Sequence, residues 1–552
     1  MRYTIFDFDN LGGGVNDRFS PNAIANTEKP NTVRNIRLDG NDIVQRKGYI
    51  TLGNIGGASG TDFAIRLMEP INSSSSANDG ILIIDDSSEE RRFVPDTLSF
   101  TAITGTTIAV TNVMNSAQYR DYFFVFNGAN QIYVIDTSTL ICSQPATKPD
   151  SIASAANFTP LCGDVYLNSL NVGGVPIAPN TLFISKPAST GTPTAVYNFS
   201  GSIGSYGDAQ EVLLPTRIVA IRRLPGFIVI FTNTSAFYYS SFVGNPLLPD
   251  IQQIPNATGA ISQRACVVTD NDLLYLSDDL TIRSVKRQIQ NSSGAQYLLS
   301  DQISLKVNKF LEKNCSRDQS RAFGYYNSRE KIAYFYLKAL DPEQFCYRIV
   351  LDYKYLDSAG NPAIFIDSNV NFSAGCYYKG ANYTGSPFLS TLGGTSSVYL
   401  DGVGIADEDD APINARWATK DFDQDDPRRL KRFYGVSVIG EVAGSFTMTI
   451  SIYVDDVLVK TQDIVSSGAN SDVPAVYAGV GSLPVASGVS KEGLIQNGDR
   501  QSFVETISFK ATGRKISVVG TVSSADANWM VERVGISYMP LRKGLTTQAD
   551  ST

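Results

Sequence analysis

Short apolar and aromatic stretches recur along the middle of this chain, each about as long as one β-strand and each followed by a polar turn. Examples are GILIID at 80–85, FIVIF at 227–231 and KIAYFY at 331–336. Several of them pair around turn residues, as in YFFVFNGANQIYVID at 122–136, which is the pattern of a β-hairpin. Together with the many Tyr, Phe, Val, Ile and Thr residues, this pattern predicts a mainly β protein.

These stretches begin at intervals of very roughly 40 to 60 residues between residues 60 and 405. Such a period is typical of the blades of a β-propeller, and it predicts a propeller-like domain of about five to seven blades over 61–410. Neither a WD nor a kelch signature is present, so the rhythm alone carries this prediction. One helix is expected at 300–314, with Ser300 as N-cap and one apolar face formed by Ile303, Val307, Phe310 and Leu311.

The pattern of apolar and polar residues changes after about residue 410. Apolar and polar residues alternate strictly in FTMTISIYV, which places five side chains on one face of a strand: Phe446, Met448, Ile450, Ile452 and Val454. A turn is expected at Asp455 and Asp456, and further alternating stretches follow. The region 411–552 is therefore predicted to be an antiparallel β-sandwich, in which 473–493 forms a long loop.

The opening segment, residues 1–60, is rich in asparagine, glycine and charge. RNIRLDGNDIVQRKGY at 34–49 predicts a small hairpin that turns at Asp39 and Gly40. Before it stand three consecutive glycines: Gly12, Gly13 and Gly14. A phosphate-binding loop would need a Lys-Ser/Thr pair or a following helix, and neither follows here. The glycines are therefore interpreted as the hinge of an arm that packs against a neighbouring protein.

The absence of histidine from the whole sequence excludes Ser-His-Asp and Cys-His catalysis and histidine-ligated metal sites. Carboxylate, lysine or tyrosine chemistry remains, but the absence favours a protein that is not an enzyme and needs no cofactor. The net charge of −8, without a long basic run, argues against static binding of nucleic acid. The six cysteines lack CxxC spacing, so they are expected to be free thiols in a reducing cytoplasm. No export signal or membrane-spanning stretch is evident.

Two acidic clusters lie near the boundary between the last two regions. DFDQDD at 421–426 begins like a calcium-binding EF-hand loop but lacks its Gly and its final Glu, so no metal site is predicted. It is interpreted as a charged interdomain loop whose acids face a basic run: Asp421, Asp423 and Asp425 opposite Arg428, Arg429, Lys431 and Arg432. DEDD at 407–410 leaves open an alternative function, a propeller that binds or cleaves glycans with paired carboxylates.

The opening segment also carries a sparse motif: Gly12, Gly13, Gly14, Pro21, Asn35, Arg46 and Gly48. Further blocks occur at 181–200 (TLFISKPASTGTPTAVYNFS), 215–240, 259–285 (with Leu280 where glycine is usual) and 417–440. Taken together, these residues resemble the tail nozzle or hub proteins of short-tailed bacteriophages, the tail tubular protein B family. The resemblance spans most of the chain, but it contains no catalytic motif.

The resemblance implies a structural virion protein assembled in the host cytoplasm. Six copies would form a homohexameric ring below the portal and the head–tail adaptor protein, in contact with a tail fibre or tailspike. Viral double-stranded DNA would pass through the ring during genome ejection without sequence-specific binding, which an acidic chain would permit. The motif of the opening segment would supply assembly contacts, and no part of the chain would insert directly into a membrane.

Overall fold

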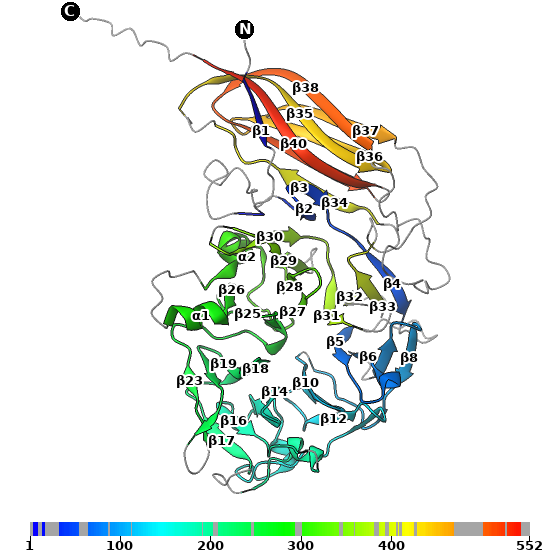
Figure 1. Ribbon diagram of the computed structural model, residues 1–552, viewed down its shortest axis with the longest axis vertical. Helices are drawn as coiled ribbons and strands as arrows, with labels where there is room; N and C mark the ends of the chain where they lie inside the picture. Colours follow the sequence, from blue (N-terminus) through cyan, green and yellow to red (C-terminus); the bar gives the residue numbers. More distant parts are fainter. Residues whose placement is uncertain are drawn as a thin grey trace, which may run out of the picture.

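The computed structural model describes the following residues: 4–8, 14–16, 33–54, 64–86, 89–111, 113–189, 191–201, 208–243, 248–292, 301–341, 346–357, 359–379, 386–391, 397–403, 407, 411–423, 428–467, 501–524 and 527–541. Within them the protein is mainly β, with a ring of small sheets below a sandwich of two longer ones (Figure 1). The mainly β class, the propeller and the sandwich predicted from the sequence are confirmed.

Seven antiparallel sheets of the described residues follow one another along the chain and form the blades of a propeller. Blade 1 has β5 (Ile65–Ile71), β6 (Gly80–Asp85), β7 (Glu90–Val94) and β8 (Ser99–Ala102). Blade 2 has β10 (Asn115–Tyr119), β11 (Tyr122–Phe126), β12 (Tyr133–Asp136), β13 (Ile141–Ser143) and the parallel β9 (Thr104–Gly105). Blade 3 has β14 (Cys162–Tyr166), β15 (Ser169–Gly173), β16 (Thr181–Ile184) and β17 (Gln210–Leu213). Blade 4 has β18 (Ile218–Leu224), β19 (Phe227–Thr232), β20 (Ala236–Tyr239) and β23 (Gln252–Gln253).

The remaining blades complete the circle. Blade 5 has β24 (Cys266–Val268), β25 (Leu273–Leu276) and β26 (Ile282–Ser284). Blade 6 has β27 (Phe323–Asn327), β28 (Ile332–Lys338), β29 (Cys346–Leu356) and β30 (Pro362–Asp367). Blade 7 has β31 (Phe372–Tyr378), β32 (Ser386–Thr391), β33 (Ser397–Asp401) and, from far earlier in the chain, β4 (Tyr49–Asn54).

The first strand of each blade lies innermost, and these strands contact one another in sequence around the ring: β5, β10, β14, β18, β24, β27, β31 and again β5. The ring is closed because β4 pairs with β33, with Tyr49 opposite Asp401 and Ile50 opposite Leu400. Each blade thus lies between two others, so both faces of its central strands are buried. In β6, Ile81 and Ile83 pack toward blade 7 while Leu82 and Ile84 pack toward blade 2. This double burial explains why the strands read as continuous apolar runs and not as alternating ones.

The sandwich consists of two antiparallel sheets. One contains β34 (Ile413–Ala418), β39 (Ile516–Ser524), β36 (Ser445–Val454) and β37 (Val457–Ser467). The other contains β2 (Ile36–Asp39), β3 (Asp42–Gln45), β40 (Asn528–Pro540), β35 (Lys431–Ala443), β38 (Gln501–Gly513) and β1 (Thr4–Phe8). The five alternating residues of β36 are all buried, as predicted, and Asp455 and Asp456 form the expected turn with positive φ. The predicted loop at 473–493 lies outside the described residues.

The opening segment is not a separate domain, which corrects the boundary predicted at residue 60. Its hairpin forms as predicted, with Asp39 opposite Asp42, but β3 pairs with β40 and so joins the sandwich. The next strand, β4, belongs to the propeller. A polar segment gains stability here because each of its strands completes a sheet whose core is supplied by other parts of the chain.

The helical elements differ from the prediction in two ways. The segment predicted as one helix is a 3-10 turn, η5 (Ile303–Lys306), followed by α2 (Asn308–Asn314), and Val307 between them has φ −126°. All four residues of the predicted apolar face are buried, whereas Ser300 lies outside the described residues. A second helix, α1 (Val285–Ser292), was not predicted. Other short elements are η1 (Ser76–Asn78), η2 (Ala155–Asn157), η3 (Pro193–Tyr197), η4 (Gln263–Ala265), β21 (Phe242–Val243) and β22 (Leu248–Pro249).

Candidate functional site

Asn35 stands where the opening segment, the propeller and the sandwich meet. Its side-chain oxygen accepts hydrogen bonds from Arg46 Nε (3.2 Å) and from the backbone N–H of Ser368 (3.0 Å), and its Nδ2 donates to the backbone oxygen of Asn414 (2.8 Å). Its φ of +57° is a conformation that asparagine tolerates better than most residues. A single amide therefore joins three parts of the chain, and no other side chain could supply both the donor and the acceptor at this backbone angle as easily.

Arg46 reaches across the same joint. Its two terminal nitrogens donate to the two carboxylate oxygens of Asp407 at 2.8 and 2.6 Å, a bidentate pair, and its side chain is about 1% exposed. Gly48 lies nearby, and its carbonyl accepts hydrogen bonds from the backbone N–H groups of Gly402 and Val403. Asn35 and Arg46 were predicted to be contacts with other subunits; this is corrected, because both are buried and bonded within their own chain.

Gly14 lies against the propeller. It has φ +71°, and a Cβ at this position would come within 2.7 Å of the backbone nitrogen of Ile364 in β30. The following residue, Val15, is fully buried and donates its backbone N–H to the Ile364 oxygen at 2.8 Å. The predicted hinge is thus a fixed contact at Gly14, made with the chain's own blade 6. Gly12, Gly13 and Pro21 lie outside the described residues.

A network of buried charges lies beside this joint. Arg37 of β2 makes a bidentate pair with Asp367 of β30 (2.7 and 2.6 Å). Arg348 of β29 bonds both Asp367 and Asp401 of β33, each at 2.6 Å. Burial opposes ionisation, yet the guanidiniums of Arg37 and Arg348 hold the pKa of Asp367 well below its usual range. The carboxylate is therefore ionised at neutral pH and ties the sandwich edge to two blades.

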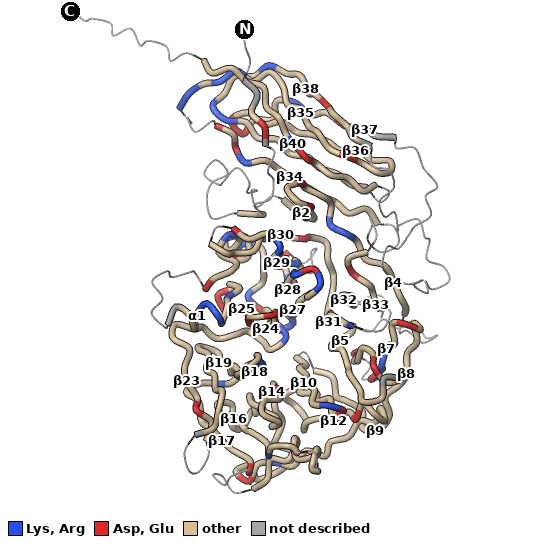
Figure 2. Tube along the Cα trace, viewed as in Figure 1, with Lys and Arg blue, Asp and Glu red and all other residues tan. Residues whose placement is uncertain are grey.

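The charged loop after the propeller makes different contacts from those predicted. Asp421 is buried and accepts a hydrogen bond from Lys515 Nζ at 2.7 Å, so its partner comes from the start of β39 and not from the basic run. Lys431 is fully buried, with Nζ donating to the carbonyls of Arg429 (3.2 Å) and Arg514 (3.0 Å). Figure 2 shows Lys and Arg segments gathered at this outer end of the sandwich.

The other members of this set are distributed as follows. Asp423 is buried, Arg432 is partly buried and Arg428 is exposed. Asp425 lies outside the described residues, as do the last three acids of the DEDD cluster. Lys515 was missed because it stands more than 80 residues away from the loop in the sequence.

The block at 259–285 folds into blade 5 and its turn. Burial raises the pKa of Asp279, but hydrogen bonds from Ser277, Thr281 and Arg283 outweigh it and lower the pKa to about 2. Leu280 has φ +61°, which explains why glycine is usual at this position in the family that the chain resembles. The carboxylate of Asp279 is occupied in stabilising its own turn.

The axis of the propeller is occupied by side chains of η4. Gln263 is fully buried and bonds the inner strands of three blades, through the oxygen of Ser116, the N–H and oxygen of Gly163 and the N–H of Ile221. Arg264 extends the other way, to the backbone oxygens of Arg66 (2.9 Å) and Ser373 (3.0 Å). Five of the seven blades are joined in this way, so the centre of the propeller is not an open channel at this level.

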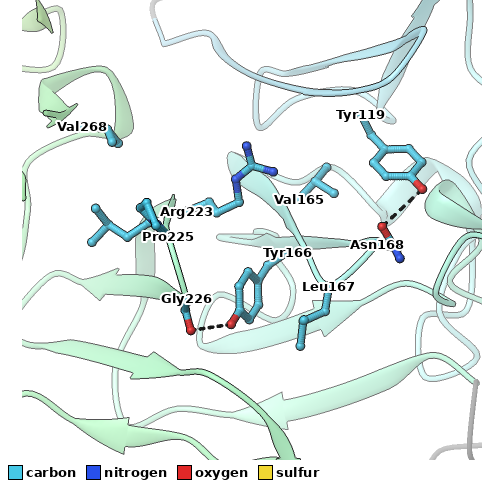
Figure 3. Close-up of a pocket in the computed structure, with 10 residues that line it drawn as sticks. Tyr119, Val165, Tyr166, Leu167, Asn168, Arg223, Pro225, Gly226 and Val268 are labelled. Carbon is cyan, nitrogen blue, oxygen red and sulfur yellow. Dashed lines mark hydrogen bonds between the residues drawn. The ribbon is translucent and has the colours of Figure 1, made fainter. Parts of the chain in front are cut away.

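A pocket of about 590 Å³ opens on one face of the propeller, where the inner strands of blades 2 to 5 end (Figure 3). It is lined by Tyr119, Val165, Tyr166, Leu167, Asn168, Arg223, Leu224, Pro225, Gly226 and Val268. Tyr166 donates its hydroxyl proton to the Gly226 or Ser240 carbonyl, and Tyr119 bonds the Asn168 amide oxygen. Sequence reasoning missed this pocket, because its residues come from four separate blades and carry no motif.

All six cysteines are free and buried. Burial raises the pKa of each thiol, for example that of Cys266 to about 12. They are therefore protonated and unreactive at neutral pH, and they serve as small apolar residues of the core. Over the described ranges, no helix is both long and apolar enough to cross a membrane.

Comparisons with known proteins add little to this picture. No protein-family model matches the chain, and no curated protein matches it. Among solved structures, it is similar to BBS1N from a crystal structure of its complex with ARL6DN (TM-score 0.38, 10% identity, 64% of this chain and 97% of that one). It is also similar to the computationally designed Ika8 protein (TM-score 0.32, 11% identity, 65% of this chain and 100% of that one). At these TM-scores the likenesses carry no argument about function.

Proposed function

We propose that this chain is a structural virion protein, a subunit of the tail nozzle or hub ring of a short-tailed bacteriophage. One observation carries the proposal. Three of the described residues of the family-like motif of the opening segment, Asn35, Arg46 and Gly48, lie together in the joint between propeller and sandwich, and a fourth, Gly14, lies against blade 6. These residues hold the joint in one arrangement, because each of them bonds a different part of the chain. A protein that must hold its shape between a pressurised head and a host cell needs such a joint.

The path of DNA in this proposal lies outside the propeller. Gln263 and Arg264 occupy the axis of the propeller, so duplex DNA would run along the axis of the ring between subunits. The net charge of −8 on each subunit supports passage without capture, since an acidic surface repels phosphate. The head–tail adaptor above and a fibre or tailspike at the side remain the expected partners.

The alternative, a tail-tip propeller that binds or cleaves host surface glycans, has less support, above all as an enzyme. It needs two carboxylates that converge on a sugar. Of the cluster at 407–410, only Asp407 lies within the described residues, and both of its oxygens are bonded to Arg46. The pocket on the propeller face contains no Asp or Glu among its lining residues, all of which are described.

Electron microscopy of the purified chain, alone and mixed with the cognate adaptor and portal, tests the proposal. We expect a ring of six copies seated on the adaptor, with the sixfold axis outside the propellers. The Asn35→Ala variant should assemble poorly or yield distorted rings, whereas Asp456→Asn, which alters an exposed acid, should assemble normally. A chain that stays monomeric in the assembled particle, or that lies at its periphery, contradicts the proposal.

A further inference from the structure

The pocket on the propeller face offers aliphatic surface and not aromatic faces. Its two tyrosines are only 8–9% exposed, and their hydroxyls are bonded within the protein. The exposed apolar surface comes from Leu167, which is 47% exposed, Val268, which is 39% exposed, and Pro225. Sugar rings bind mainly on open aromatic faces and through several free polar groups, so this lining suits aliphatic side chains better.

Leu167 occupies its position at a cost to stability. It forms a two-residue turn with Asn168 between β14 and β15, in which the two residues have φ +49° and +63°. Such turns favour Asn, Asp or Gly, because a leucine side chain clashes with the backbone at positive φ. Leu140 and Leu280 also have positive φ, but they are buried and gain packing energy in return. Leu167 is exposed and has no such gain, and strain of this kind is typical of functional positions.

The rim of the pocket carries positive charge. Arg223 is an exposed lining residue, and Figure 3 shows its guanidinium beside Val165 at the pocket. Arg120 follows the lining residue Tyr119 in the chain, and its guanidinium carbon lies 5.2 Å from the centre of the Tyr119 ring. None of the ten lining residues, every one of them described, is acidic. Asp164, the neighbour of the lining residue Val165, accepts the backbone N–H of Arg223 at 2.8 Å, and burial raises the pKa of its carboxyl. The exposed side chain of Arg223 therefore supplies the positive charge beside the apolar floor.

We propose that this pocket binds a short extended segment of a partner protein in which a carboxylate lies next to aliphatic side chains. The aliphatic side chain rests on Leu167 and Val268, and the carboxylate pairs with Arg223. The pocket lies on blades 2 to 5, away from the joint with the sandwich at blades 6 and 7, so it stays accessible in the folded chain. This inference is independent of whether the chain forms a ring.

Fluorescence anisotropy with two labelled hexapeptides, Leu-Asp-Leu-Asp-Leu-Asp and its Leu-Asn-Leu-Asn-Leu-Asn counterpart, tests the proposal on the full chain. We expect the acidic peptide to bind and the neutral one to bind at least roughly tenfold more weakly, because a charge-assisted hydrogen bond is lost. Arg223→Glu should weaken the acidic peptide by at least about tenfold. Arg317→Glu, an exposed arginine outside the pocket, should not.

Leu167→Asn separates binding from folding. Asparagine suits a positive φ, so this variant should keep or raise the thermal midpoint while it loses binding of the acidic peptide. A lower midpoint would show that Leu167 has a structural role and would overturn the inference. The inference also fails if the acidic peptide does not bind, or if it binds Arg223→Glu and Leu167→Asn as well as the wild type. A labelled oligogalacturonate that binds more tightly than the peptide would reassign the pocket to acidic glycans.

Discussion

Asp367 is the residue on which the charges of the domain joint converge. It is fully buried and bonds both Arg37 of the opening segment and Arg348 of blade 6, and Arg348 in turn bonds Asp401. Burying charges costs free energy. Such a network of buried ion pairs therefore contributes more to the choice of one arrangement of the domains than to net stability. Removal of the Asp367 carboxylate nevertheless lowers the stability strongly, because the arginines remain buried without their partner.

Asp367→Asn should lower the free energy of unfolding by about 3 to 5 kcal/mol at neutral pH, measured by urea denaturation. Asp456→Asn, which removes an exposed partner of Lys515, should change it by less than about 1 kcal/mol. If Asp367→Asn lowers the free energy of unfolding as little as the control does, the role assigned to the network of buried charges is contradicted.

The pH dependence of stability follows from the same residue. The pKa of Asp367 is lowered in the folded chain, and an unfolded aspartate has a pKa of about 3.9. Its stabilising contribution is therefore fully present above about pH 4 and is lost as the pH falls below that value. The thermal midpoint of the wild type should fall steeply below pH 4, and that of Asp367→Asn should fall less steeply. Parallel curves for the two proteins would show that Asp367 does not titrate as argued.

Gly14 and Gly40 form a matched pair for testing the arm. Both have positive φ, but a Cβ at Gly14 would meet the backbone of Ile364 whereas a Cβ at Gly40 meets nothing within 4 Å. Gly40→Ala should cost about 1 kcal/mol from the backbone angle alone, and Gly14→Ala should cost clearly more. The comparison is made by thermal unfolding. Equal costs would mean that the segment around Gly14 does not hold its place on β30.

At the scale of elements, the sequence predicted most of what depends on local pattern. The hairpin at Asp39–Gly40, the alternation of β36 and the apolar strands of the blades are all present, because side-chain periodicity and turn residues determine them. The break at Val307 and the helix α1 were not predicted, since tertiary packing decides them. The pairing of β4 with β33 joins residues about 350 positions apart, and no local signal marks it.

The closure of blade 7 by β4 can be tested with Leu52, which is 2% exposed in the core between blades 7 and 1. Leu52→Ala should cost about 2 to 5 kcal/mol and should speed hydrogen exchange in β33 before it affects blade 3. Leu170→Ala, a buried leucine of blade 3, is the matched control and should speed exchange around β15 first. If Leu52→Ala speeds exchange equally in all blades, closure by β4 is not a separable step.

At the scale of the whole molecule, propeller and sandwich share one apolar core. A single cluster of buried residues extends from blades 5 and 6 through the opening hairpin into both sheets of the sandwich. The two tryptophans of the chain, Trp417 and Trp529, are fully buried in the sandwich part of it. The change of residue pattern near residue 410 separated the two domains, but it could not show that they share an apolar core. The residues that bridge the domains belong to the polar opening segment.

The shared core predicts one cooperative unfolding transition. Tryptophan fluorescence, which reports on the sandwich, and far-ultraviolet circular dichroism, which reports on all strands, should give the same midpoint in urea. Asn35→Ala weakens the joint and should move the two midpoints apart. Separate midpoints in the wild type would show that the domains unfold independently despite their contact.

The pairing of β1, β3 and β4 with strands hundreds of residues later in the chain also governs how the protein is made. These strands are made long before their partners: β4 must wait for β33, about 350 residues later, and β1 and β3 must wait for β40, about 490 to 530 residues later. A nascent chain therefore carries unpaired strand edges through nearly the whole of its synthesis, and such long-range pairing is slow. A product that stops before β33 can complete neither domain, and one that stops between β33 and β40 lacks a complete sandwich. Incomplete chains would thus expose unpaired strands that proteases can cleave, and only full-length copies would enter an assembly.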